Sequence, residues 1–203
     1  MRLGKKLRIA TILMSMAMAA TTLIFATFAI TQNSADADYD GVLKIIGNAD
    51  IDVEIKFIEV KSGKVLYTIT ADEKGIVEKK DGVTVKEVKE VAELTTYAIV
   101  TKPELNLGDD YKFAITIKNR NVSGGGTGFA VAKIGDVSFV PAEGFSNYFN
   151  TVNPPINEEN NKLNPGQELQ LEIYLSTKSD AVLESGEIEF SYTLNIEANK
   201  VTA

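Results

Sequence analysis

The sequence lacks cysteine, histidine and tryptophan altogether. Without histidine and cysteine, the usual zinc sites have no ligands and the usual nucleophilic triads have no base or thiol. We therefore expect a protein that is not an enzyme and that uses no cofactor. The absence of cysteine also excludes disulfides, so stability must come from packing.

Acidic residues outnumber basic ones, above all beyond the first few residues. The 203 residues include 21 lysines and arginines against 28 acidic residues, for a formal net charge of −7. The first 26 residues carry four of these cations and no acid, so a chain without them has a net charge of −11. An acidic body of this kind argues against nucleic acid and against anionic lipid surfaces as partners.

The four cations precede an uncharged run of 22 residues, Ile9 to Ile30. Cations before an apolar run are typical of an export signal. The run is also long enough to span a bilayer as a retained helix. We favour a signal peptide of residues 1–26, because a signal peptidase cuts close to the end of the apolar run. A cut after Ala37 fits the small-x-small pattern better but lies further out. The membrane and signal peptidase are then partners during export only, and the mature chain is extracellular.

Cleavage after Ala26 leaves a β-prone segment at the new N-terminus. Its residues are Thr27, Phe28, Ala29, Ile30 and Thr31. Burying Phe28 and Ile30 stabilises by about 1.5–3 kcal/mol each, and leaving them in water is a liability. One way to bury these two side chains is strand addition to a neighbouring molecule. The alternatives are that they are the tail of the signal or the first strand of the chain's own sheet.

The body of the chain alternates apolar and polar residues with a period of two, which indicates strands with one buried face. The predicted strands are Gly41 to Ile45, Ile51 to Phe57, Val65 to Thr70, Thr95 to Val100, Tyr111 to Lys118, Phe129 to Ile134, Val137 to Val140, Leu169 to Leu175 and Ile188 to Ile196. Pro141 to Pro165 is irregular, and we expect its aromatics Phe145, Tyr148 and Phe149 to pin it to the core. Many strands with regular turns predict an all-β sandwich or jelly roll. We expect residues 42–203 to form a single domain, preceded by residues 27–41 as a candidate donor segment and spacer.

The stretch from Ala71 to Glu90 is densely charged. Asp81-Gly82 lies between two β-branched segments and predicts a projecting hairpin. A short helix from Val85 to Leu94 competes, because apolar residues recur there every third position. We expect the charges of this stretch to form a solvated face.

Two further sites are candidates. Asn121-Val122-Ser123 matches the N-glycosylation pattern at Asn121. The carboxylates of Asp36, Asp38 and Asp40 match the opening of a calcium loop, but Gly47 stands where the bidentate glutamate is required. This favours a solvated acidic spacer over a calcium site. A glycine run at 124–126 has no Gly-Lys-Ser/Thr ending, so we expect a loop and not a phosphate site.

Three short motifs resemble the TasA/camelysin family of exported fibre subunits, which includes subunits of archaeal bundling pili. The first is Phe25-Ala26-Thr27-Phe28 followed by Gly41-Val42-Leu43-Lys44-Ile45. The second is Leu105-Asn106-Leu107-Gly108 before the next strand, where Leu107 replaces the usual proline. The third is Leu163-Asn164-Pro165-Gly166, then a strand, a loop with Gly186, and Phe190 to Ala198. Lys61 to Leu94 has no counterpart in the family pattern.

The resemblance implies a jelly-roll-like sandwich and a homopolymeric filament, a biofilm fibre or bundling pilus. In such a filament the N-terminal segment of one identical subunit fills a groove in the next. Some camelysin relatives are described as metalloproteases, but a zincin needs two histidines and this chain has none.

Two other classes remain open at this point. A type IV-like pilin would keep Ile9 to Ile30 as a helical filament core, although the early glutamate of such helices is missing. A membrane-tethered surface binding or adhesion module would never polymerise. A mature N-terminus at Lys5 supports the pilin, whereas one at Thr27 or Phe28 supports strand donation.

Overall fold

The computed structural model describes residues 41–89, 95–101, 105–121, 130–142, 145–158, 160–181 and 191–202. All of these belong to one compact unit, Asp40–Ala203. The predicted signal segment, the donor residues 27–31 and the acidic residues Asp36, Asp38 and Asp40 lie outside the described residues. They stay predictions.

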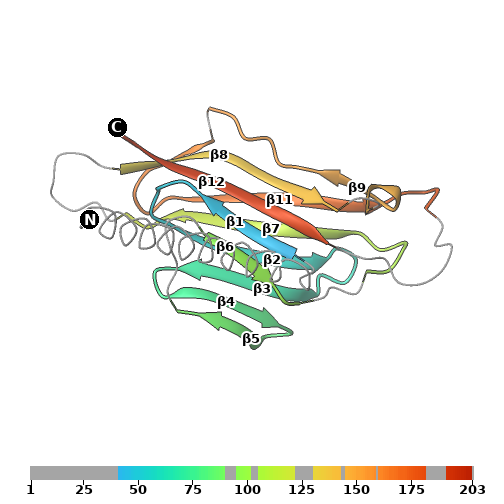
Figure 1. Cartoon of the computed structure of the whole chain (residues 1–203). Helices are drawn as coiled ribbons and strands as arrows, with labels where there is room; N and C mark the ends of the chain where they lie inside the picture. Colours follow the sequence, from blue (N-terminus) through green and yellow to red (C-terminus); the bar gives the residue numbers. More distant parts are fainter. Residues whose placement is uncertain are drawn as a thin grey trace, which may run out of the picture. The chain divides into compact units, whose positions relative to one another are not determined.

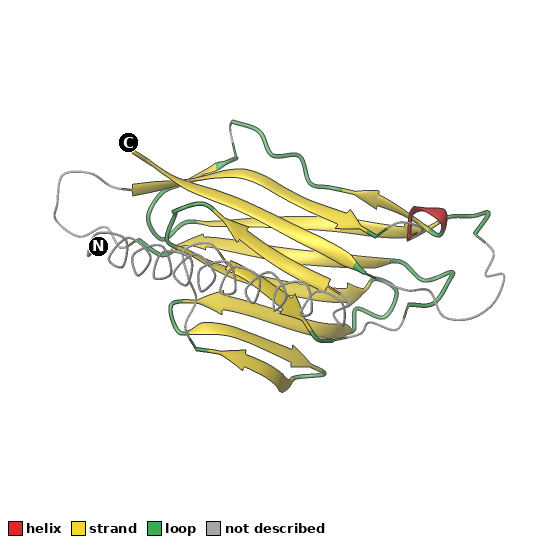
Figure 2. Cartoon of the chain, in the orientation of Figure 1, coloured by secondary structure: helices red, strands yellow, loops and turns green. Residues whose placement is uncertain are grey.

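The described residues form two β-sheets that pack face to face (Figures 1 and 2). The five-stranded sheet has the order β10 (Lys162–Leu163), β8 (Ala130–Pro141), β12 (Tyr192–Thr202), β1 (Gly41–Ile46) and β6 (Thr95–Ile99). The seven-stranded sheet has the order β5 (Val83–Val88), β4 (Gly75–Lys80), β3 (Val65–Asp72), β2 (Ile51–Glu59), β7 (Tyr111–Asn119), β11 (Glu168–Thr177) and β9 (Phe149–Val152). The prediction of an all-β sandwich is confirmed.

Period-two alternation places one face of each long strand in the core, as expected. In β2 and β7 the alternate residues Ile55, Phe57, Phe113 and Ile115 are almost completely buried. Aromatic rings then join the two sheets. Phe113 of β7 lies 5.4 Å, centroid to centroid, from Phe139 of β8. Such ring contacts add about 0.5–1.5 kcal/mol to area burial and help to stabilise a sandwich without disulfides.

The first strand, β1, lies inside its sheet. It pairs in parallel with β12 and antiparallel with β6. Gly41 at its start packs against the ring of Tyr192, where an added Cβ would lie 2.6 Å from a ring carbon. A side chain at this position would therefore force the ring or the strand to move.

The charged stretch after Ala71 forms the predicted hairpin. Strands β4 and β5 flank Asp81 and Gly82, whose φ angles are 48° and 81°. Two consecutive positive φ angles are what a type I′ turn requires. The competing helix from Val85 is wrong, because Val83 to Val88 form strand β5, in which Lys86, Glu87 and Val88 pair with β4 and Val85 is the extra residue of a bulge.

Two strands differ from the prediction by more than a residue or two at an end. The segments Phe129 to Ile134 and Val137 to Val140 were expected as separate strands, but 130–141 is one strand, β8. Its register with β12 shifts between Glu197 and Ala198, and Gly135 is the extra residue on the other side of this bulge. The last strand runs on to Thr202 in the described residues, beyond the predicted end at Ile196. A bulge adds one residue without breaking the pairing, which a strict period of two does not reveal.

The predicted irregular crossover holds three short elements. These are a 3-10 turn (Phe145–Asn147), β9 and β10. Phe145 and Phe149 are buried and stack with ring centroids 4.9 Å apart. The prediction that these aromatics pin the crossover to the core is confirmed, and Tyr148 packs against the same core while half-buried.

Candidate functional site

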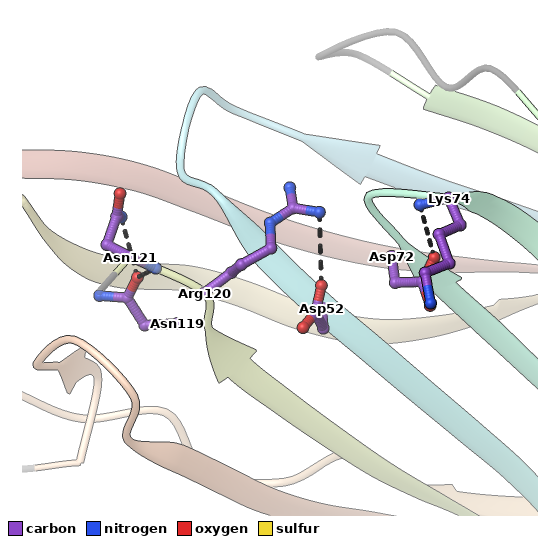
Figure 3. A network of polar contacts seen from close by, with 6 residues as sticks. All are labelled: Asp52, Asp72, Lys74, Asn119, Arg120 and Asn121. Atoms are coloured by element: carbon purple, nitrogen blue, oxygen red, sulfur yellow. Dashed lines mark hydrogen bonds and ion pairs between the residues drawn. The ribbon is translucent and has the colours of Figure 1, made fainter.

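Of the candidate site residues, only Asn121 lies among the described residues. It follows β7 and is half-buried. Its side-chain nitrogen donates a hydrogen bond to Oδ1 of the fully buried Asn119 at 2.9 Å (Figure 3). A glycan would be attached to that same nitrogen. In the folded domain the nitrogen that would carry the glycan is therefore already hydrogen-bonded to Asn119. Glycosylation of Asn121 stays a prediction.

Strand addition needs a sheet edge, so the margins of the two sheets are the structural candidates for a site. Among the described strands, β5 and β9 end the seven-stranded sheet, and β6 and β10 end the five-stranded sheet. Strand β10 pairs only two residues of the longer β8.

The margin at β8 is closed by the chain itself. The Ile134 amide donates to the Asn161 carbonyl at 2.7 Å, and the Phe139 amide donates to Oδ1 of Asn153 at 3.2 Å. The buried Asn119 side chain donates to the Leu163 carbonyl of β10 at 2.8 Å. The crossover thus supplies the partners that a further strand would supply.

The margin at β6 is different, because the seven-stranded sheet extends past it. Strands β4 and β5 lie beyond β6 at the lower edge of Figure 1. No residue of β5 is buried, and Val83 is 67% exposed. Val83 nevertheless lies on the inner face, because it pairs with Lys80 and Lys80 pairs with the buried Tyr67. Part of the inner face of the wide sheet is thus uncovered by the narrow one.

Glu78 of β4, next to this uncovered region, reaches across to the end of β6. It is completely buried, and its carboxylate accepts three hydrogen bonds. The donors are the Tyr97 hydroxyl at 3.1 Å, the Val100 amide at 3.1 Å and the Thr101 amide at 2.7 Å. A buried carboxylate is costly unless several donors satisfy it, and here they come from one strand end. Glu78 therefore joins the two sheets.

Lys86 of β5 reaches the same edge from the neighbouring strand. Its ammonium donates to the Ala98 carbonyl at 3.1 Å and lies 4.7 Å from the centre of the Tyr97 ring. A cation over an aromatic face is attracted by the ring quadrupole. Two side chains of opposite charge, from β4 and β5, thus meet the backbone of β6.

The polar contacts continue into the core. The Tyr67 hydroxyl of β3 contacts the Tyr192 hydroxyl of β12. Burial raises the pKa of Tyr67 well above its usual range, and the adjacent Tyr192 phenol adds to the rise. The Tyr67 phenol therefore stays protonated at neutral pH and acts as a neutral hydrogen-bonding group.

The outer face of the seven-stranded sheet carries exposed ion pairs. Lys112 and Glu172 meet at 2.6 Å, and Lys118 and Glu168 at 3.4 Å. The hydrogen bond from Lys112 lowers the pKa of Glu172, with help from the Tyr174 hydroxyl, and it raises the pKa of Lys112. Exposed pairs of this kind contribute little to stability and keep a surface soluble.

A cavity of about 310 Å³ opens between the two sheets at the ends of β1 and β3. Arg120 lies there, with Nη1 3.5 Å from Oδ1 of Asp52 (Figure 3). Neither atom has a hydrogen-bond partner, although both are shielded from solvent. Burial raises the pKa of Asp52 in spite of the nearby guanidinium, and Asp72 and Glu73 add to the rise. Over the described ranges, no group of three potential ligands is placed to hold a metal ion.

Sequence reasoning missed Glu78 and Lys86. The expectation that this charged stretch is a solvated face is wrong for Glu78, although Asp72, Lys79, Lys80 and Glu87 are exposed. One signal was present, because Ile76 and Glu78 are two residues apart and share a face of the strand. The buried Ile76 therefore carries Glu78 inward with it.

Comparison with known proteins adds no relative. No family model, no curated protein and no solved structure matches the chain. Within the part of the chain that the structure describes, no helix is long and apolar enough to cross a membrane.

Proposed function

We propose that this chain is the structural subunit of an extracellular filament. The N-terminal residues 27–31 of one subunit add a strand to the next, so that subunits polymerise head to tail. The proposal includes a signal segment, residues 1–26, and a jelly-roll-like arrangement of the sandwich. The export signal, the apolar residues Phe28 and Ile30, and the resemblance of three short motifs to exported fibre subunits support it.

One observation in the described residues carries the proposal, namely the unequal width of the two sheets at β6. A strand added beside β5 would extend the wide sheet with none of the described strands opposite it. A strand added beside β6 would lie over the uncovered inner face of β5 and bury its own inward side chains. The β8 margin already has its partners in the crossover.

The energetics favour assembly over exposure. Burial of Phe28 and Ile30 stabilises by about 1.5–3 kcal/mol each, and the added strand gains backbone hydrogen bonds. The donor and acceptor surfaces are different parts of the subunit, so each contact is head to tail. Contacts of this kind propagate as an open filament unless the rotation closes a ring.

Deletion of residues 27–40 from the mature protein tests the proposal. We expect folded monomers that do not elongate, as seen by size-exclusion chromatography, circular dichroism and electron microscopy. Normal fibres from this truncated protein would overturn the proposal.

A double substitution gives a matched control for the deletion. Phe28→Ser with Ile30→Ser removes the apolar pair, whereas Thr27→Ser with Thr31→Ser changes two residues of the opposite parity. We expect the first variant to stop elongation and the second to assemble like the native protein. Equal assembly of the two variants would show that the apolar pair plays no part in the contact.

A further inference from the structure

The outer edge of β6 is already bonded by charged side chains of the opposite sheet. The Ala98 carbonyl accepts from Lys86, and the Val100 amide donates to Glu78, each at 3.1 Å. Ala98 and Val100 are two residues apart, so their backbone groups point to the same side of the strand. Their partners come from β5 and β4, which lie beyond β6 on the side away from β1 (Figure 1). Two side chains thus occupy positions where a neighbouring strand would bond.

We propose that Lys86 and Glu78 hold the place of a strand at this edge, and that residues 27–31 of a second copy replace them. This inference rests on the proposed function and assigns its docking surface. A donor amide takes over the Ala98 carbonyl from Lys86, and a donor carbonyl takes over the Val100 amide from Glu78. Glu78 keeps its hydrogen bonds to the Tyr97 hydroxyl and the Thr101 amide.

The side chains on both sides fit this exchange. Alternate strand residues share a face and lie about 6.6–6.8 Å apart, so Phe28 and Ile30 face inward together. Below them lies the inner face of β5, where Val83 and the half-buried Val88 flank Lys86. The donor residues 27–31 carry no charge. Lys86, which lies at a partly exposed position, moves toward solvent as an apolar residue takes its place over β5.

The arrangement has a consequence for the free subunit. Open strand edges pair indiscriminately with other edges, and natural proteins block them with charged side chains. A docking strand takes the position that Lys86 occupies at the Ala98 carbonyl, so docking is a displacement. A segment that gains much apolar contact on docking can displace Lys86. Strand edges that bury little apolar surface cannot.

Cysteine cross-linking tests the location, since the native chain has no cysteine to interfere. Ala29→Cys with Ala98→Cys places both thiols on the outward parity of their strands, and neighbouring residues in a strand pair lie within disulfide reach. Ala29→Cys with Thr96→Cys covers the adjacent register. Ala29→Cys with Val152→Cys, on the β9 margin, is the matched control.

We expect covalent ladders from assembled Ala29/Ala98 or Ala29/Thr96 material and none from the Ala29/Val152 control. Fibres that cross-link only through Val152 would overturn the β6 assignment while leaving strand donation intact. A disulfide within a single monomer would show that the segment completes its own sheet, which overturns both. Absence of fibres from the native mature chain would overturn the proposed function itself.

Elongation kinetics test the part played by Lys86. Lys86→Met removes the ammonium, and Lys79→Met removes the same charge from the exposed face of neighbouring β4. We expect Lys86→Met to elongate several-fold faster than both the native protein and Lys79→Met, in light scattering seeded with preformed fibres. Lys86→Gln retains a neutral donor and should fall between. Equal rates for Lys86→Met and Lys79→Met would refute the displacement step.

Discussion

The two margins of the five-stranded sheet are closed in different ways. At β8 the chain uses its own backbone and neutral amides, chiefly Asn161, Asn153 and Asn119. At β6 it uses two charged side chains that come from the opposite sheet. A margin closed by the following backbone is permanent once the chain has folded. A margin closed by side chains can be vacated by rotamer changes, so only the β6 margin is suited to an exchange of partners.

The largest effect is expected at the β6 margin, from Glu78→Leu. The substitution leaves the Tyr97 hydroxyl and two backbone amides without their acceptor in a buried place. Each buried donor left without an acceptor costs about 1–3 kcal/mol, and Glu78 accepts from three donors. Urea unfolding should show a loss of this size, whereas Glu87→Leu, exposed on β5, should change the free energy of unfolding by less than about 0.5 kcal/mol. A small loss for Glu78→Leu would mean that the carboxylate does not hold the two sheets together.

The corresponding change at the β8 margin is Asn119→Ala. It leaves the Leu163 carbonyl and the Asn121 amide without their side-chain partner, which should cost about 1–3 kcal/mol. Hydrogen exchange should quicken around β10, and fibre assembly should be unchanged because this margin takes no donor. The exposed Asn150→Ala serves as the control. Loss of assembly at normal stability would show that both margins exchange partners.

A smaller effect is expected from Tyr67→Phe, which removes one hydroxyl of the buried phenol pair. We expect a loss of about 0.5–1.5 kcal/mol at neutral pH. The raised pKa of Tyr67 also predicts a pH effect: its contribution is complete below the unfolded-state pKa, near 10, and is lost as the pH rises above that value. The alkaline decline in stability should therefore be shallower in Tyr67→Phe. Parallel alkaline curves for the two proteins would contradict this reading.

The smallest effect is expected on the outer face, from Glu172→Gln. Because its pKa is lowered in the folded state, Glu172 stabilises above the unfolded-state value of 4.5, and this contribution disappears as the pH falls through the folded value. The pair is exposed, so a difference of about 0.2–1 kcal/mol at pH 7 should vanish near pH 2. Urea unfolding at both values checks this, with the exposed Glu158→Gln as the control. A difference that persists in acid would assign the effect to packing.

The sequence predicted the strands of this fold well and their arrangement poorly. Alternation of the kind seen from Ile51 to Phe57 marks a half-buried strand directly, and Asp81-Gly82 marks the hairpin turn. The parallel pairing of β1 with β12 brings residues together from opposite ends of the domain, and no local pattern encodes such a contact. The bulge at Gly135 was not predicted for a related reason: its partner residues Glu197 and Ala198 are distant in sequence.

The sequence likewise revealed one part of the candidate site and not the other. The apolar residues Phe28 and Ile30 are visible as an unusual N-terminus, and they stay a prediction because they lie outside the described residues. Glu78 and Lys86 were hidden by the average polarity of their surroundings. Their role depends on which strand of the opposite sheet lies across from them, and sheet-to-sheet placement is a property of the whole fold.

The interior position of β1 bears on how the domain would respond to tension. Strands flank it on both sides, and all of its backbone hydrogen bonds lie across the strand axis. A force pulling at Gly41 along that axis loads both ladders at once, in shear, and cannot peel them apart one bond at a time. Strand β1, which follows the predicted spacer, is therefore held by backbone hydrogen bonds on both of its sides.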